Sequence, residues 1–306
     1  MNDKVKKLVI RAMRKSQLIK AIAHLIVTQE TAPSLQVVNA SLPARDSYEY
    51  LKHKFIQNGN NHPVNQFGRA QIVERFEMID AHIPMATTAT DGLFLAELLL
   101  NMQADGVIVE CGCYAGGSTS KLSIIAKHLG RSLIVYDSFE GLPTVEQKYL
   151  RDQHCRRSDT WVTDWTAGRY AARFDEVKDN LNEFGEFSVC KFVPGWFSET
   201  LINENLPAQV AFAFTDVDMA NSARDCFVSL WPRLSEGGVF VTHDTAYIKV
   251  LQEFYNPELW SKQFCAIPPI LFGAGFGLCN ESPHMGYMVK GESLSPEYLK
   301  QLTIDK

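Results

Sequence analysis

Several acidic side chains and one histidine directly follow runs of apolar residues. Glu110, Asp137, Asp216 and the pair His243–Asp244 all stand at such positions. Carboxylates and an imidazole can accept hydrogen bonds, bind a divalent cation or remove a proton. If the apolar runs are parallel strands, their carboxyl ends lie along one edge of a sheet, where open α/β sheets bind ligands. The sequence therefore predicts that these side chains gather in one site.

A glycine turn joins the first of these runs to a predicted helix. It contains Gly112 and Gly116, and it begins at Glu110. In a dinucleotide-binding G-x-G-x-x-G turn the second glycine would fall at Tyr114, whose side chain would hinder a pyrophosphate, and Glu110 would repel one. A nicotinamide-dependent oxidoreductase is therefore disfavoured. An acid here suits a ligand with a cationic end, such as the ammonium and sulfonium of S-adenosylmethionine. The structural alternative is a turn that only lets strand and helix pack.

The acid after the second apolar run adds to this candidate ligand site. Asp137 ends the run "LIVYD", and its carboxylate is placed to accept both hydroxyls of a ribose. Together with the turn it strengthens the case for an adenosyl ligand. The residues that we expect to bind S-adenosylmethionine are Glu110, Gly112, Tyr114, Gly116, Ser118, Asp137 and Ser138.

Strands and helices alternate between residues 107 and 245. The strands are near-continuous apolar runs, which implies a parallel sheet covered on both faces, that is, a doubly wound α/β fold. Two helices precede it, at 72–83 and 90–102, with Thr90 or Asp91 as the N-cap of the second. Residues 275–291 are expected to form a hairpin. The expected strands are 107–113, 133–137, 187–195, 210–218 and 237–245, and the expected helices between them are 118–129, 171–185 and 222–235.

Residues 1–70 differ in composition from the rest of the chain. Residues 1–29 carry seven Lys or Arg against one acid, with apolar residues near helical spacing, which predicts a basic amphipathic helix. Such a helix packs on its own domain or on a second subunit, or lies on a membrane surface. A polar connecting segment follows, with a helix near 47–55. We therefore expect a helical N-terminal extension and linker at 1–70 and the ligand-binding domain at 71–306.

The bulk composition excludes some classes of protein. The chain has 306 residues, is 46% hydrophobic and has a net charge of −5. An acidic balance argues against nucleic acid as the partner. Seven scattered cysteines predict reduced thiols and a cytoplasmic location. No apolar run reaches the ~18–20 residues of a membrane span.

Four segments together resemble the macrocin O-methyltransferase family. They are "VIVECGCYAGGSTS" (107–120), "DSFEGLP" (137–143), "VPGWFSETL" (193–201) and the stretch 215–245, so the resemblance covers about residues 90–245. It implies a class I S-adenosylmethionine-dependent enzyme with a Rossmann-like sheet. Such enzymes methylate a hydroxyl of a sugar or natural product, commonly with Mg²⁺. Family members often use N-terminal helices to oligomerise, so the resemblance also implies a homo-oligomer.

The resemblance assigns roles to the acids, with one departure. At the position of Asp216 the family has a residue that is both metal ligand and candidate base, and two consecutive acids at the next strand end complete the metal site. Here those positions hold His243 and Asp244. Three arrangements are open. His243 ligates an ion such as Mn²⁺ with Asp216 and Asp244, or His243 turns away and two carboxylates hold Mg²⁺, or the site is metal-free with His243 as the base.

Other segments are candidates for the acceptor site. Residues 148–170 are expected to form a lid, and residues 267–280 a flexible wall. Trp196 and Phe197 are expected in the core, with the pocket wall as the alternative. The predicted function is methyl transfer to a hydroxyl of a small molecule, with deprotonation assisted by a metal or by Asp216 and His243. The rivals are a methyltransferase acting on nitrogen or on a lipid at a membrane surface, and a catalytically silent protein that binds S-adenosylmethionine.

Overall fold

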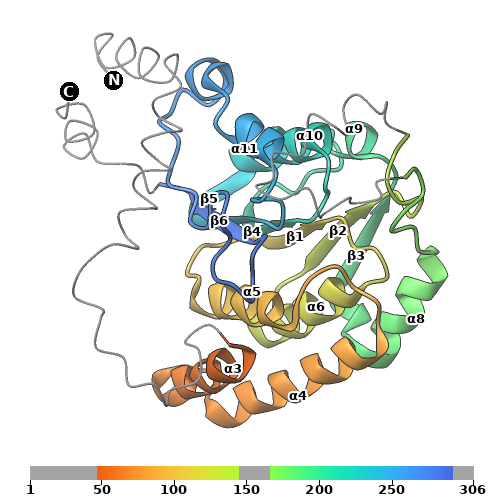
Figure 1. The fold of residues 1–306 in the computed structure, drawn as a ribbon, viewed down its shortest axis with the longest axis vertical. Helices are drawn as coiled ribbons and strands as arrows, with labels where there is room; N and C mark the ends of the chain where they lie inside the picture. The colour runs from red at the N-terminus through yellow and green to blue at the C-terminus, as the bar shows by residue number, and fades with distance from the viewer. Residues whose placement is uncertain (1–46, 145–165, 292–306) are drawn as a thin grey trace, which may run out of the picture.

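A computed structural model describes residues 47–144 and 166–291 of the chain. Its centre is a six-stranded sheet with the order β3-β2-β1-β4-β5-β6 (Figure 1). The first five strands are parallel to their neighbours, and β6 runs antiparallel to β5. The predicted doubly wound, mostly parallel sheet is therefore confirmed. The strands are β1 Val107–Cys111, β2 Leu133–Asp137, β3 Cys190–Pro194, β4 Val210–Thr215, β5 Leu234–Thr242 and β6 Gly286–Val289.

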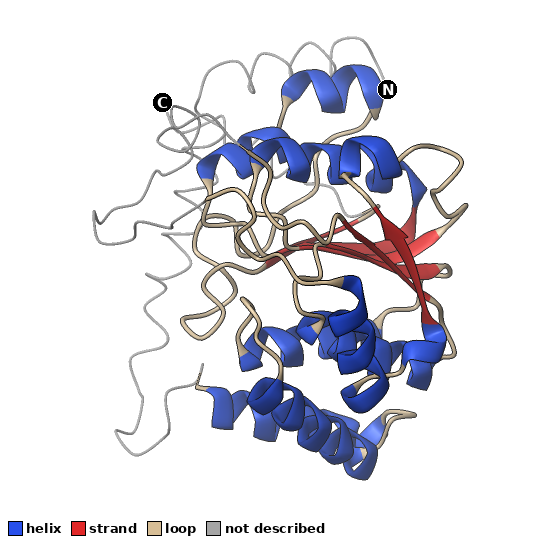
Figure 2. Ribbon diagram, turned by 90° about the vertical axis from the view of Figure 1, so that its right-hand side faces the viewer, coloured by secondary structure: helices blue, strands red, loops and turns tan. Residues whose placement is uncertain are grey.

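Helices cover both faces of the sheet, as the edge-on view shows (Figure 2). On one face lie α5 (Ala89–Asn101), α6 (Gly117–Leu129) and α8 (Phe174–Phe184). An outer layer of α3 (Tyr48–Gln57) and α4 (Gln66–His82) packs on them (Figure 1). On the other face lie α9 (Phe197–Thr200), α10 (Ala220–Leu230) and α11 (Ile248–Phe254). The short helical turns are η2 Asn58–Asn61, η3 Phe187–Val189, η4 Trp231–Arg233 and the π-helical η5 Leu259–Gln263.

Successive strand residues supply the two halves of the core. Ile108 and Val135 belong to the cluster under α5 and α6, whereas Val109 and Ile134 belong to the cluster under α10 and α11. This alternation follows from the two-residue period of a strand. Because both faces are covered at the centre of the sheet, β1 and β4 are almost entirely buried and apolar, which makes them recognisable in the sequence. None of the helices within 47–144 and 166–291 is long and apolar enough to cross a membrane.

The outer helical layer joins the predicted N-terminal extension to the main domain. The predicted boundary at residues 70/71 falls inside α4, which is one continuous helix. Arg69 is fully buried, and it donates to a carboxylate oxygen of Glu97 at 2.5 Å and to the Phe55 carbonyl at 3.0 Å. The described residues, 47–144 and 166–291, therefore pack as one unit. Residues 1–46, with the predicted basic helix, lie outside the described residues.

Two local predictions were wrong. The N-cap of α5 is Thr88, not Thr90 or Asp91, because Thr88 and Asp91 form a reciprocal capping box that starts the helix earlier. Residues 275–291 do not form a hairpin of their own. Instead β6 takes β5 as its antiparallel partner, and within 275–291 only the isolated bridge Cys279–Ser282 is formed. Pairing with the long, buried β5 gives β6 more ladder bonds than a local hairpin would.

Candidate active site

A pocket lies at the carboxyl ends of β1, β2 and β4. The predicted site residues in its wall are Gly112, Tyr114, Ser118, Asp137, Ser138 and Asp216. Glu110, Gly116, His243 and Asp244 lie behind the wall, not in it. The site is therefore where the sheet topology predicts it, but its members form two groups, one on the surface of the pocket and one supporting it.

The glycines of the turn are required by packing. Gly112 has φ +85°, and a Cβ there would overlap the backbone oxygen of Asp216 in the next strand. A Cβ on Gly116, also at φ +85°, would press on the side chains of Val177 and Leu181 in α8. The structural alternative raised for this turn thus explains why these two positions are glycine. It leaves open what the pocket above them binds.

Glu110 is buried beneath the first turn of α6. The hydroxyl of Ser118 donates to one carboxyl oxygen at 2.6 Å, and the other oxygen has no partner. Burial raises the pKa of Glu110 to about 8, against the lowering effect of the Ser118 hydrogen bond. At neutral pH this side chain is therefore mostly protonated, and it reaches the pocket only through Ser118.

Asp137 is fixed at the pocket wall by backbone donors. The Cys113 amide donates to one carboxylate oxygen at 2.6 Å and the Phe139 amide to the other at 2.7 Å. Each oxygen keeps a further lone pair for a ligand hydroxyl. The carboxylate is thus held in one orientation, and it ties the glycine turn to the end of β2.

Strained backbone is concentrated around the pocket. Among the described residues, five that are not glycine have positive φ, and three of them line the pocket, namely Tyr114, Tyr170 and Asp218. The rings of Tyr114 and Tyr170 meet edge to face with centroids 5.4 Å apart. Positive φ costs free energy in residues with a Cβ, so its concentration here marks a site where position matters more than local stability.

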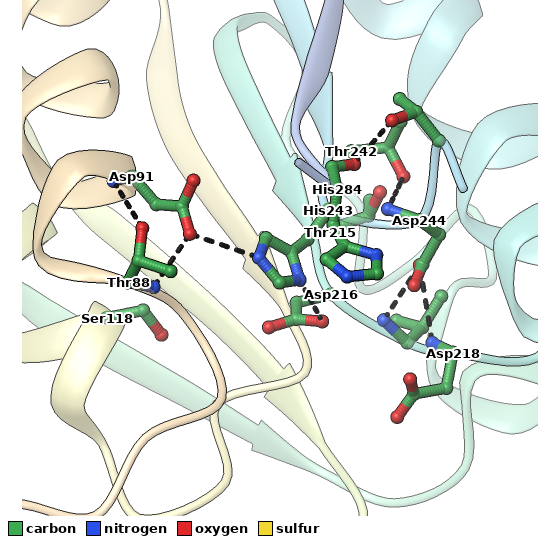
Figure 3. A network of polar contacts seen from close by, with 12 residues as sticks. Thr88, Asp91, Ser118, Thr215, Asp216, Asp218, Thr242, His243, Asp244 and His284 are labelled. Atoms are coloured by element: carbon green, nitrogen blue, oxygen red, sulfur yellow. Dashed lines mark hydrogen bonds and ion pairs between the residues drawn. The ribbon is translucent and has the colours of Figure 1, made fainter. Parts of the chain in front are cut away.

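His243, at the end of β5, lies between two carboxylates (Figure 3). Its Nδ1 is 3.4 Å from Asp216, and its Nε2 is 3.2 Å from Asp91, in the first turn of α5. Burial alone would lower the pKa of His243, but the charges of Asp216 and Asp91 and the hydrogen bonds to them outweigh it and raise this pKa well above its usual value. The imidazole is therefore a cation that donates from both nitrogens.

Asp244 faces the backbone of the loop after β4. One carboxyl oxygen accepts the amides of Val217 at 3.2 Å and Asp218 at 3.3 Å, and the other is buried without a partner. Burial, together with the charges of Asp218 and Asp216, raises the pKa of Asp244 well above its usual value. This side chain holds Asp218 in its left-handed conformation (Figure 3).

The donor set at this position does not fit a divalent cation. Both nitrogens of His243 already face carboxylates, and Asp244 is turned toward amide donors. A metal ligand must present a free lone pair, so a cation bound here would have to displace the hydrogen that His243 turns toward Asp216. Within the part of the chain that the structure describes, no cluster of three His, Cys, Asp or Glu residues is arranged to hold a metal ion.

Asp218 is the second acid at the end of β4. It lines the pocket beside Asp216, and it was not among the predicted site residues. Burial and the charge of Asp216 raise the pKa of Asp218 to about 7. A carboxylate with this pKa is a suitable proton acceptor at neutral pH. Its spacing of two from Asp216 was the sequence signal for this role.

The sequence missed further residues of the site, and it misplaced others. Trp196 and Phe197, expected in the core, line the pocket, because the left-handed turn at Gly195 carries them to its edge. Residues 267–280, expected as a wall, are absent from the pocket lining. Of the predicted lid at 148–170, residues 148–165 lie outside the described residues, whereas Tyr170 lines the pocket. The remaining unpredicted wall residues are Met85, Ala86 and Thr87 before α5, Cys113, Gly141, Leu142, Pro143, Gly195, Val217 and Ser222.

The parallel strand order and the pocket at the strand ends define a doubly wound α/β protein whose pocket lies at the topological switch point, where proteins of this class bind ligands. The family model for macrocin O-methyltransferases matches residues 94–258, which is more than half of the chain. The chain therefore belongs to the macrocin O-methyltransferase family, and the resemblance found in its motifs is confirmed.

Characterised proteins with similar sequences are O-methyltransferases of Streptomyces. The chain is 30% identical over 171 residues to the 8-demethyl-8-(2,3-dimethoxy-alpha-L-rhamnosyl)-tetracenomycin-C 4'-O-methyltransferase of Streptomyces olivaceus, covering 54% of this chain and 63% of that protein. It is 28% identical over 156 residues to the demethyldecarbamoylnovobiocin O-methyltransferase of Streptomyces niveus, covering 48% and 56%. The chain thus spans less than two thirds of the length of either relative.

Two solved structures are similar to this chain. The O-methyltransferase NovP is 19% identical, with a TM-score of 0.46 over 74% of this chain and 81% of its own. The calicheamicin methyltransferase CalS11 is 18% identical, with a TM-score of 0.48 over 85% of this chain and 100% of its own.

Proposed function

We propose that this protein is an S-adenosylmethionine-dependent O-methyltransferase that acts on a hydroxyl of a small molecule, a sugar or natural product. The observation that carries the proposal is the composition of one pocket. A fixed carboxylate and a helix start lie at one end, and two acids, one with a pKa near 7, lie at the other. The family membership and the curated relatives support the same reaction.

The cofactor end of the pocket is built around Asp137 and α6. The lone pairs of Asp137 that remain beside its two amide bonds would accept the ribose hydroxyls. The N-terminus of α6, where Gly116 provides no side-chain cap, would receive the carboxylate of the methionine part through its free backbone amides. When bound, S-adenosylmethionine supplies a sulfonium methyl group that needs only an aligned nucleophile. Gly112, Tyr114 and Ser138 complete this part of the wall, while Glu110 and Gly116 act from behind it.

The acidic end of the pocket would remove the proton of the acceptor. Asp218 is the base in this proposal, because its pKa near 7 lets it be unprotonated at neutral pH and still take up a proton. Asp216 lies beside it, and its negative charge contributes to that pKa. His243 does not reach the pocket wall. It donates to Asp216 and holds it in place, so we assign it a positioning role instead of that of the base.

The same geometry supports a reaction that needs no divalent cation. In this proposal the positive charge beside Asp216 is the imidazolium of His243. The third arrangement considered from the sequence, a metal-free site, is therefore favoured, with Asp218 in place of His243 as the base. An assembly of several copies, a cytoplasmic location and a role of residues 1–29 at a membrane surface stay predictions.

The first test is calorimetric titration of S-adenosylhomocysteine into chelator-treated protein, repeated with Mg²⁺ and with Mn²⁺. We expect micromolar binding that neither metal changes. The second test follows methyl transfer to glycosides with free hydroxyls, with the product bond assigned by NMR. Absence of binding under all conditions would refute the proposal. Binding with transfer only in the presence of a metal would refute its metal-free form alone.

A further inference from the structure

We propose that Asp91, the capping-box acid of α5, is a positioning residue that fixes the imidazole of His243 and, through it, the carboxylate of Asp216. The inference rests on the proposed function for its kinetic consequences. It concerns a residue outside the span 94–258 that the family model matches, in an element that does not contribute to the strand-end motifs.

Asp91 is completely buried and serves three partners with two oxygens. One oxygen accepts the Thr88 amide at 2.7 Å and lies 3.2 Å from Nε2 of His243. The other accepts the hydroxyl of Ser282, from the loop before β6. Burial alone would raise the pKa of Asp91, but these donors hold it below its usual value, so the side chain is a carboxylate. A helix cap requires only the Thr88 bond, which leaves the other two contacts unexplained by capping.

The three elements that meet at Asp91 surround the catalytic end of the pocket. Asp91 itself comes from α5 and His243 from the end of β5 (Figure 3). Ser282 comes from the loop before β6. The capping partner Thr88 also donates to the Glu281 carbonyl at 2.9 Å, and the residues just before it, Met85 to Thr87, line the pocket. Asp91 thus connects three parts of the site: the pocket-lining segment Met85–Thr87 through Thr88, the loop before β6 through Ser282, and His243.

The geometry assigns His243 one ring orientation. With Nε2 held by Asp91, Nδ1 points to Asp216, which lines the pocket. Without Asp91 the imidazole would keep a single carboxylate partner, and only packing, including the His284 ring 5.6 Å away, would hold its orientation. A misplacement of about 1 Å in a catalytic group can cost about 100-fold in rate. We therefore expect Asp91 to affect kcat, not cofactor binding.

The kinetic test is a double-mutant cycle with a matched control. Asp91→Ala should lower kcat about 10- to 100-fold and change the affinity for S-adenosylhomocysteine by less than about twofold. In a His243→Ala background, Asp91→Ala should lower kcat by less than a further factor of about two, because the imidazole through which Asp91 acts is already absent. Thr88→Val removes the other half of the capping box and leaves Asp91 facing His243. It should lower the melting temperature comparably but keep kcat within about threefold.

A second readout does not depend on activity. In protein labelled with ¹⁵N-histidine, the Nε2 resonance of His243, identified by its loss in His243→Ala, should shift in Asp91→Ala and not in Thr88→Val. If Asp91→Ala does not fold, Asp91→Ser keeps a hydroxyl at this helix position but is too short to reach the ring. An unmoved His243 resonance, or a kcat loss equal to that of Thr88→Val, would overturn the proposal. If the wild type transfers no methyl group, the proposed function fails, while the resonance still decides the role of Asp91.

Discussion

Two neighbouring carboxylates at the end of β4 are controlled by different partners. His243 holds the side chain of Asp216, whereas Asp244 holds the backbone of Asp218. The four residue types were readable from the sequence, and so was their position at strand ends. Which acid each of His243 and Asp244 contacts could not be predicted from the sequence. It depends on side-chain directions and on Asp91, which comes from a helix far away in the chain.

The pH dependence of the reaction is predicted at Asp218. Because its pKa is about 7 and a base must be unprotonated, kcat/KM should fall about tenfold per pH unit below pH 7 and reach a plateau above it. The apparent value belongs to the Asp216–Asp218 pair. Asp218→Asn should lower kcat by about 100-fold or more and remove this limb of the profile. Asp225→Asn, which changes an acid of α10 outside the pocket wall, is the control. A limb that persists in Asp218→Asn would assign the base elsewhere.

The pH dependence of stability is predicted at Glu110. Its folded-state pKa of about 8 lies above the unfolded value, so the unfolded chain loses this proton first. The group therefore lowers the free energy of unfolding as pH rises from about 4.5 to about 8, by up to about 1.4 kcal/mol per pH unit. Glu110→Gln keeps an acceptor for Ser118 and should flatten this slope in denaturant titrations at pH 5 and pH 8. Glu258→Gln, at an exposed side chain, should not.

At the scale of elements, the turn between β1 and α6 sets the geometry of the pocket floor. It must pass close to the end of β4 and also present Tyr114 and Ser118 to the pocket. The sequence predicted a strand, a turn and a helix here, and the predicted helix start is one residue from the observed one. The prediction succeeded because the apolar run, the glycines and the helix-forming residues all indicate the same order of elements. The close approach of β4 to Gly112 is a tertiary fact that no local pattern encodes.

Two glycine-to-alanine substitutions, at Gly112 in this turn and at Gly130 at the end of α6, separate the cost of a positive φ from the cost of atomic overlap. Gly112→Ala meets both a positive φ and the Asp216 backbone, so we expect a loss of about 3 kcal/mol or more, or failure to fold. Gly130, at the end of α6, also has positive φ, but a Cβ added there would meet nothing within 4 Å. Gly130→Ala should therefore cost only about 1 kcal/mol. Equal losses in thermal or chemical unfolding would contradict the assigned overlap.

At the scale of the whole molecule, the outer layer of α3 and α4 is attached through a buried charge. Arg69 has no exposed surface, and its partners are the Glu97 carboxylate and the Phe55 and Val64 carbonyls. These partners bind Nε and Nη1, whereas Nη2 is buried without a hydrogen-bond partner, so the charge depends on the Glu97 ion pair. This attachment makes the layer part of the domain that carries the site, although its sequence is polar enough to suggest a linker.

Removal of this charge should loosen the outer layer first. Arg69→Ala leaves three acceptors without their donor, so we expect a loss of about 3 kcal/mol in the free energy of unfolding. In hydrogen exchange, the amides of α3 should lose protection before those of the sheet. Lys262→Ala, which removes an exposed pair with Glu258, should change stability by less than about 0.5 kcal/mol. Uniform loss of protection across the sheet would argue against a separately attached layer.

The sequence by itself determined the sheet, its covering helices and the edge at which the polar residues gather. These features follow from the periods of apolar residues and from turn chemistry, which act over a few neighbouring positions. The family motifs are also local, because each lies at one strand end or at two successive strand ends. Hence the sequence alone is enough to predict that Asp137, Ser118 and Asp216 lie at the pocket.

Only the tertiary structure decided which groups face one another. It turned Asp244 to the backbone, brought Trp196 to the pocket, put β6 beside β5 and set His243 between Asp91 and Asp216. The physical reason is that the hydrogen-bonding and charge state of a buried group depend on its spatial neighbours. From the sequence alone, His243 could be a metal ligand, a residue turned away from the site, or the base. Two carboxylates, contributed by α5 and by the end of β4, decide that it is a buried cation.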